Sequence, residues 1–158
     1  MKRSFMAGLV VLVAFAAASC DFFGLADAPE LQVIARANPG ETAADMAHLN
    51  EINFGQPAEG VNEDVVFRIR NVGTADLILE TGGPDFVAVI DQNESEVPFS
   101  ILTGAGTNTI EPGQEVEVTV RFTGQNTSTR YTAKLVIPSN DVEHPDYFLN
   151  LTGDGVSF

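Results

Sequence analysis

The segment 115–123 alternates apolar and polar side chains without a break. Val116, Val118, Val120 and Phe122 occupy every second position, and polar residues fill the positions between them. An alternation with period two places the apolar side chains on one face of an extended strand. The segment therefore predicts a half-buried β-strand, which needs partner strands to pair with it and a second layer to cover its apolar face.

The same alternation recurs in short segments along the chain, and glycine or proline separates most of them. We expect strands at 29–35, 51–55, 64–71, 77–80, 86–90, 97–102, 115–123, 130–137 and 147–152. Segment 41–50 has no sustained apolar stripe, and we expect it to be a loop. About seven to nine short strands at this spacing are typical of an antiparallel β-sandwich rather than of βαβ units. The expected fold class is therefore all-β.

The composition limits the partners that this chain can bind. It carries 22 acidic and 8 basic residues, which gives a net charge of −14. A surface this acidic repels phosphate backbones, so we expect no nucleic-acid partner. It also repels anionic lipid headgroups, so we expect any membrane attachment to come from acyl chains rather than from a basic patch.

The first 19 residues have the three parts of a secretory signal: the basic pair Lys2 and Arg3, an apolar run at 5–18, and small residues before Cys20. The run 17–20 (AASC) resembles the lipobox of a bacterial lipoprotein signal, although Ala17 stands where leucine is usual. The apolar run is shorter than the ~20 residues of a membrane-spanning helix. Ordinary signal cleavage just before Ser19 is the alternative, and it leaves an exposed thiol.

We expect signal cleavage before Cys20 and lipidation of its sulfur, for example with palmitate. The chain then divides into a signal peptide at 1–19, a lipidated cysteine with a tether at 20–28, and one domain at 29–158. The expected location is a bacterial membrane, on the periplasmic side or at the cell surface. Cys20 is the only cysteine, so no disulfide within the chain is possible and the hydrophobic core alone must hold the domain.

Eight short motifs follow one another along the chain: PELQV (29–33), INFG (52–55), FRIRNVGTADL (67–77), IEPGQ (110–114), VTVRF (118–122), YTAKL (131–135), IPSND (137–141) and LTGDG (151–155). Together and in this order they resemble the bacterial choice-of-anchor D domain, a relative of the ASPM/SPD-2/Hydin (ASH) group of immunoglobulin-like modules. The resemblance covers nearly all of 29–158. It implies an immunoglobulin-like sandwich with a structural or binding role and no catalytic residues to carry over.

The chain departs from this pattern in two places. Val142 stands where the family usually has proline, and segment 92–103 is longer than usual. We expect the longer segment to form an extra edge strand or a protruding loop, because loops are where such scaffolds place recognition.

The motifs also predict turn chemistry. We expect Gly73 and Gly113 to supply positive φ angles where the chain reverses, and Asn140 and Asp141 to hydrogen-bond their own backbone in a turn.

Catalytic and metal-binding patterns are weak in this sequence. Nothing resembles a nucleophile elbow, and zinc needs clustered ligands that Cys20 and the distant His48 and His144 do not supply. The oxygen-rich segments 62–64, 91–94 and 141–143 leave calcium as the less remote option. We expect no enzyme activity, no cofactor and no metal site.

We therefore expect a lipid-anchored, non-catalytic envelope protein that binds a protein or a glycan, through exposed sheet edges or through 92–103. The alternatives are a structural spacer or assembly subunit of an envelope complex and, with less support, a calcium-dependent module.

Overall fold

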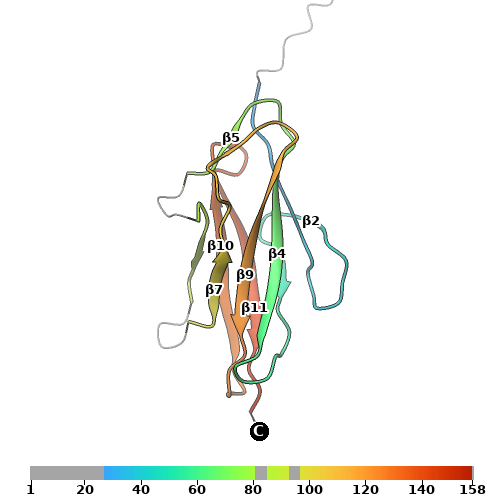
Figure 1. Cartoon of the computed structure of the whole chain (residues 1–158), viewed down its shortest axis with the longest axis vertical. Helices are drawn as coiled ribbons and strands as arrows, with labels where there is room; N and C mark the ends of the chain where they lie inside the picture. The colour runs from blue at the N-terminus through green and yellow to red at the C-terminus, as the bar shows by residue number, and fades with distance from the viewer. Residues whose placement is uncertain (1–26, 81–84, 93–96, 158) are drawn as a thin grey trace, which may run out of the picture.

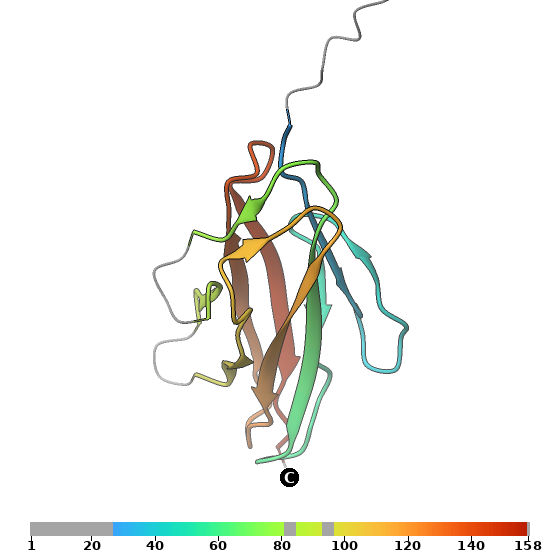
Figure 2. The same cartoon turned by 45° about the horizontal axis from the view of Figure 1, so that its top comes forward.

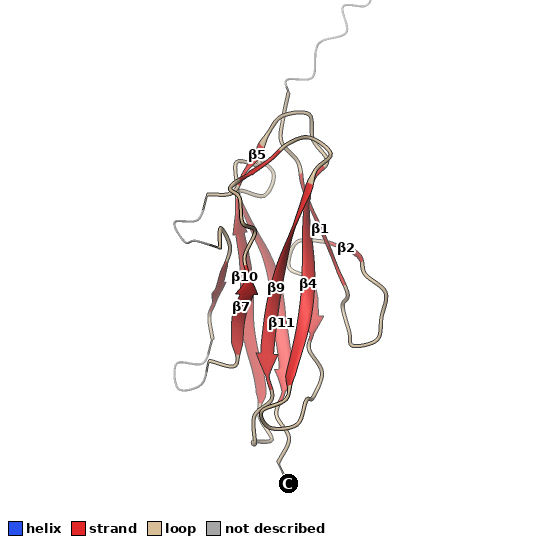
Figure 3. Ribbon diagram, viewed as in Figure 1, coloured by secondary structure: helices blue, strands red, loops and turns tan. Residues whose placement is uncertain are grey.

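Strands and turns make up all the regular secondary structure in the part of the chain that the computed structural model describes, residues 27–80, 85–92 and 97–157 (Figure 3). In these ranges no helix is long and apolar enough to cross a membrane. The leader and Cys20 lie outside the described residues.

The larger sheet has five strands in the order β2-β1-β4-β9-β7. Their bounds are β1 (Leu31–Ala35), β2 (Ala44–Met46), β4 (Asn62–Asn71), β7 (Phe99–Thr103) and β9 (Glu115–Thr123). All neighbours in this sheet pair antiparallel, with Phe67 opposite Val118 at the centre of β4 and β9. The alternation of 115–123 thus becomes strand β9, as predicted, and β9 lies between two partners.

The smaller sheet has four strands in the order β3-β11-β10-β6. Their bounds are β3 (Glu51–Asn53), β6 (Ala88–Ile90), β10 (Arg130–Pro138) and β11 (Asp146–Asp154). The short strands β5 (Leu77–Ile78) and β8 (Thr109–Ile110) pair with each other across one end of the sandwich (Figure 2). The all-β sandwich is confirmed, but β3 runs parallel to β11, so the smaller sheet is not wholly antiparallel.

The core lies between the two sheets and is built by the inward face of each strand. Tyr131, Ala133, Leu135 and Ile137 of β10 are buried, as the alternation predicts. Three phenylalanines from different elements meet in this layer: Phe54, Phe99 and Phe122. The ring centroids of Phe99 and Phe122 are 4.8 Å apart. Such aromatic packing adds to the burial of apolar area that stabilises the fold.

Two short strands differ from the prediction for their segments. Residues 44–46 form β2 rather than a loop, because Met46 is buried and pairs with Val33 of β1. Residues 109–110, for which no strand is predicted, form β8.

The unusually long segment 92–103 contains an edge strand, which is one of the two forms predicted for it. Phe99–Thr103 becomes the edge strand β7, while residues 93–96 lie outside the described ranges.

The sandwich is elongated, and its two ends carry different parts of the chain (Figure 1). We call the end formed by residues 27–31, 71–76, 111–114 and 139–146 the N-terminal end. The opposite end, formed by 55–61, 124–129 and 155–157, is the C-terminal end. Strands of nine residues such as β9 and β10 connect them, which separates the two ends by about 30 Å.

Turn chemistry at the N-terminal end is partly as predicted. Gly113 has φ +77°, but Gly73 does not have a positive φ. A Cβ on Gly73 would lie 2.3 Å from the Ala28 carbonyl oxygen and 2.5 Å from the Glu30 nitrogen. Glycine is required there because the N-terminal segment crosses directly over the turn.

Two buried polar side chains fix the loops at this end. The Asn71 side chain accepts a hydrogen bond from the Gly73 backbone and donates to the carbonyl of Ile110 (2.8 Å). The Asp141 carboxylate accepts from the backbone N–H of Glu143 at 2.9 Å, which confirms the predicted turn. Asn140 acts differently, because its side-chain oxygen accepts from Ile78 across the molecule.

Candidate interaction surfaces

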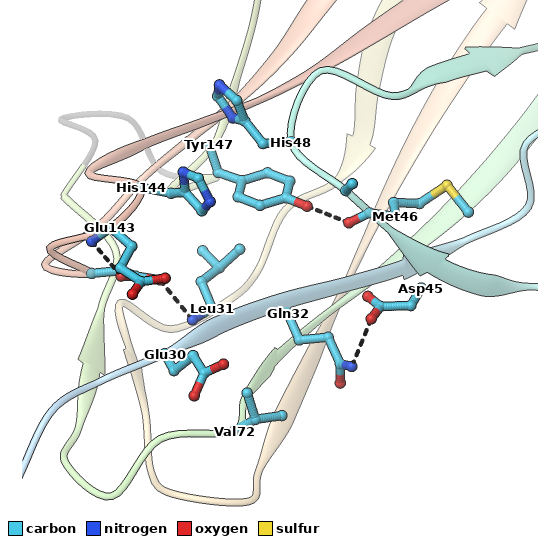
Figure 4. A pocket seen from close by; sticks show the side chains of 12 residues that line it. Glu30, Leu31, Gln32, Asp45, Met46, His48, Val72, Glu143, His144 and Tyr147 are labelled. Atoms are coloured by element: carbon cyan, nitrogen blue, oxygen red, sulfur yellow. Dashed lines mark hydrogen bonds between the residues drawn. The ribbon is translucent and has the colours of Figure 1, made fainter.

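A pocket of about 260 Å³ opens at one corner of the N-terminal end (Figure 4). Four segments that are far apart in the sequence enclose it: the start of β1, β2 with its connection to β3, the β4–β5 turn, and the β10–β11 connection with the start of β11. The lining residues are Glu30, Leu31, Gln32, Asp45, Met46, Ala47, His48, Val72, Asp141, Glu143, His144 and Tyr147. The pocket is acidic, since four carboxylates line it and no lysine or arginine does.

Tyr147 forms one wall of this pocket. Its hydroxyl donates a hydrogen bond to the carbonyl oxygen of Met46 and so connects β11 to β2. Burial, with a smaller effect of the Asp45 carboxylate, raises the pKa of Tyr147 to about 12. The phenol therefore stays protonated at neutral pH and acts as a structural donor.

The structure brings His48 and His144 together, which corrects the prediction that they are distant. Their rings stack with centroids 5.0 Å apart and planes 8° from parallel. His48 Nδ1 accepts a hydrogen bond from the backbone N–H of Phe148 at 3.1 Å. Because that nitrogen is engaged, the pair serves to pack two connections against each other. Among the described residues, no group of three or more His, Cys, Asp or Glu side chains is arranged to hold a metal ion.

Asp141 lies at the back of the pocket and is 3% exposed. One carboxylate oxygen accepts the Glu143 hydrogen bond of the turn, and the other accepts from the backbone N–H of Leu31 at 2.9 Å. Two backbone donors compensate the burial of this charge. Asp141 therefore holds the N-terminal segment to the β10–β11 connection.

Described acidic residues of the other oxygen-rich segments also take part in ion pairs, while residues 93 and 94 lie outside the described ranges. Residues 62–64 lie in strand β4 and not in a loop. Asp64 accepts two hydrogen bonds from Arg121, at 2.7 and 2.8 Å, and these hold the pKa of Asp64 below its usual value. Glu63 pairs with Arg36, and Asp91 pairs with Lys134 at 2.7 Å.

A second surface lies along the β6–β7 flank, which we define as residues 85–92 and 97–105. The Gln92 amide accepts from the backbone N–H of Phe99 and donates to its carbonyl, both at 3.0 Å. The backbone N–H of Ala105 donates to the carbonyl of Asp85, also at 3.0 Å. These bonds join the residues on either side of β6 to strand β7 and to the residues just after it.

Three aliphatic side chains of this flank face solvent. Val97 is 68% exposed, Leu102 is 51% exposed and Ile90 is 40% exposed. Ile90 belongs to β6 and Leu102 to β7, so both edge strands contribute. The unusually long segment 92–103, which the sequence singled out for recognition, belongs to the same flank. No pattern in the sequence indicated that the Gln92 side chain would hydrogen-bond both backbone groups of Phe99.

Another pocket, of about 230 Å³, lies at the C-terminal end and is lined by Gln56, Ser128, Thr129, Asp154, Gly155, Val156 and Ser157. Its polar side chains are three hydroxyls, the Gln56 amide and the Asp154 carboxylate. The Gln56 amide already donates to the carbonyl of Gly155 at 3.1 Å.

Comparison with known structures finds the same fold in proteins of low sequence identity. The ASH/PapD-like domain 7 of human CEP192 aligns with a TM-score of 0.51 and 13% identity, over 99% of this chain and 99% of that one. A protein of unknown function from Porphyromonas gingivalis W83 aligns with a TM-score of 0.50 and 15% identity, over 83% of this chain and 67% of that one. A search of curated proteins found no match.

A family model for HYDIN/CFA65/VesB-like Ig-like domains matches residues 46–154. This range begins in β2 and extends to the end of β11, so it includes most of both sheets. The predicted kinship with ASH-like immunoglobulin-like modules is thereby confirmed. The chain belongs to the HYDIN/CFA65/VesB-like family of Ig-like domains.

Proposed function

We propose that this protein is a lipid-anchored, non-catalytic module of the bacterial cell envelope, and that its Ig-like domain recognises a protein partner through the β6–β7 flank. The observation that carries the proposal is the exposure of Ile90, Val97 and Leu102 on this flank of an interaction-type fold. Single exposed aliphatic residues need no explanation, but several on adjoining edge strands favour a contact surface.

The hydrogen bonds of Gln92 bear on how the partner is recognised. An added β-strand needs the free N–H and carbonyl groups of an edge. At Phe99 the Gln92 amide already occupies both. We therefore expect the partner to contact the exposed side chains of this flank rather than to extend the sheet at Phe99.

In-cell cross-linking of the tagged, lipidated protein, followed by identification of captured proteins, tests this proposal. The test variant combines Val97→Glu with Leu102→Glu. Its matched control is Val142→Glu, because Val142 is 82% exposed but lies at the N-terminal end. We expect one dominant partner that the double variant loses and the control keeps. Equal capture by all three proteins contradicts recognition through this flank.

The second candidate function is a structural spacer. The N-terminal segment leaves one end of the elongated sandwich and the C-terminus lies at the other (Figure 1), a geometry that suits a rod between two attachment points. Efficient cross-linking with no enriched protein supports the spacer. In that case a glycan screen is the next measurement, since a glycan ligand leaves the same result.

A further inference from the structure

The chain is fixed to the N-terminal end of the sandwich from Ala28 onward. The Ala28 carbonyl accepts from the backbone N–H of Thr74 at 2.9 Å, and the Glu30 carbonyl accepts from Val72 at 2.9 Å. The backbone N–H of Leu31 donates to Asp141 at 2.9 Å. A tether that begins at Cys20 is therefore attached to the domain at its N-terminal end.

The length of this tether limits how far the domain can stand from a membrane. Residues 21–27 lie between Cys20 and Ala28. At most 3.3–3.6 Å per residue, a chain of this length reaches about 25 Å. The C-terminal end lies about 30 Å farther along the strands. The distance between the two ends is therefore as large as the whole reach of the tether.

Charge is distributed unevenly along the same axis. The N-terminal end contains seven acidic residues and neither lysine nor arginine: Asp27, Glu30, Asp76, Glu111, Asp141, Glu143 and Asp146. Within 55–61, 124–129 and 155–157, the segments of the C-terminal end, Glu59 is the one charged residue. At the adjoining strand ends Arg130 lies opposite Asp154, so these two charges offset each other. The two ends thus differ in electrostatic character as well as in their distance from the anchor.

We infer that the domain stands upright on the membrane, with its acidic N-terminal end toward the lipid and its C-terminal end, which has a small net charge, presented to the surroundings. The inference rests on the lipid anchor at Cys20 in the proposed function. Anionic headgroups repel the carboxylates of the N-terminal end over about a Debye length, roughly 8 Å at physiological salt. This repulsion prevents the N-terminal end from lying directly on the membrane surface, while the short tether keeps it close to the membrane.

This orientation assigns roles to the surfaces of the domain. The acidic corner pocket faces the lipid, where a large partner has the least room. The amide- and hydroxyl-rich loops at 55–61 and 124–129 are farthest from the membrane, and the β6–β7 flank is open from the side. A partner in the aqueous phase therefore meets the flank and the C-terminal end first.

Energy transfer from single labelled cysteines to an acceptor dye on lipid headgroups measures this orientation. The full-length lipidated protein is reconstituted in phosphatidylcholine vesicles with Val142→Cys or, as the matched probe, Ser128→Cys. Val142 is at the N-terminal end and Ser128 at the C-terminal end, and both are exposed. An acylated Cys20 has no free thiol, so each added cysteine is the single reactive site.

With a short-range dye pair, we expect several-fold more transfer from position 142 than from position 128. Adding phosphatidylglycerol at low salt should lower the transfer from position 142, and high salt should restore it. Equal transfer from both positions, or more from 128, overturns the orientation. Transfer from 142 that does not respond to lipid charge or salt overturns the electrostatic part.

Flotation with the vesicles separates this inference from the proposed function. A protein that floats but shows equal transfer keeps its anchor and loses the upright orientation. A protein that does not float, or whose Cys20→Ala form floats equally well, overturns the anchor and the orientation together.

Discussion

At the scale of single residues, Tyr147 is the buried polar group whose removal has the clearest expected effect. Tyr147→Phe leaves the Met46 carbonyl without its donor. An unsatisfied buried acceptor costs about 1–3 kcal/mol. We therefore expect the variant to lose about this much free energy of unfolding at pH 7, measured by urea denaturation.

Alkaline pH gives the same residue a second signature. In the unfolded chain a tyrosine ionises at about pH 10, whereas the folded pKa of Tyr147 is about 12. The unfolded state therefore releases its proton first, and the stabilisation present below pH ~10 is lost as the pH rises from ~10 to ~12. The expected loss is on the order of 2 kcal/mol in the parent protein. It should be absent from Tyr147→Phe, and an equal pH slope in both proteins contradicts it.

Gly73 and Gly113 should respond differently to the same substitution. A Cβ at Gly73 meets the backbone at Ala28 and Glu30, whereas nothing lies within 4 Å of a Cβ at Gly113. Gly113→Ala should lower the free energy of unfolding by about 1–2 kcal/mol, because only its positive φ is unfavourable for alanine. We expect Gly73→Ala to lower the free energy of unfolding by more than Gly113→Ala does, because the N-terminal segment must move to make room for the Cβ.

Asparagine separates these two causes. It tolerates a left-handed conformation, so Gly113→Asn should recover part of the loss in thermal denaturation, while Gly73→Asn should recover none. Equal recovery at both positions contradicts the steric account of Gly73.

At the scale of elements, strand β7 contains both core and solvent-exposed side chains, which a deletion of 92–103 would remove together. Phe99 is 1% exposed and packs between Phe54 and Phe122, whereas Leu102 on the same strand is 51% exposed. Phe99→Ala should cost about 3–5 kcal/mol in urea denaturation. Leu102→Ala should change stability by no more than about 0.5 kcal/mol. Comparable losses of unfolding free energy for Phe99→Ala and Leu102→Ala would contradict the assignment of Phe99 to the core and Leu102 to the surface.

An element can be predicted from the sequence when local residues determine it, and not when its contacts are with residues distant in the sequence. Strand β9 was predicted with its observed bounds because its alternation is local and long. Strand β2 was not, because its pairing with β1 and the hydrogen bond from Tyr147 to Met46 come from elsewhere in the chain. The parallel pairing of β3 with β11 depends in the same way on partners that are distant in the sequence.

The candidate surfaces follow the same rule. The Asp141 turn was predictable because its bond to Glu143 spans two residues. The stacking of His48 on His144 requires two connections to meet in space, and no local pattern indicates it.

At the scale of the whole molecule, the direction of the chain relates the proposed anchor and the proposed recognition surface to the distribution of charge. The N-terminal segment enters at an end rich in carboxylates, and the strands extend from there to an end with a small net charge. This polarity is compatible with both a recognition module and a spacer, since each needs one end held and the other free. Both depend on attachment at Cys20.

The most direct test of that attachment is the intact mass of the mature protein, purified from the membranes of cells that make the full-length chain. We expect a mature chain that begins at Cys20 and carries the added mass of acyl chains. A mature chain that begins at Ser19 without acyl chains would contradict the lipid anchor, and with it the function proposed for this domain.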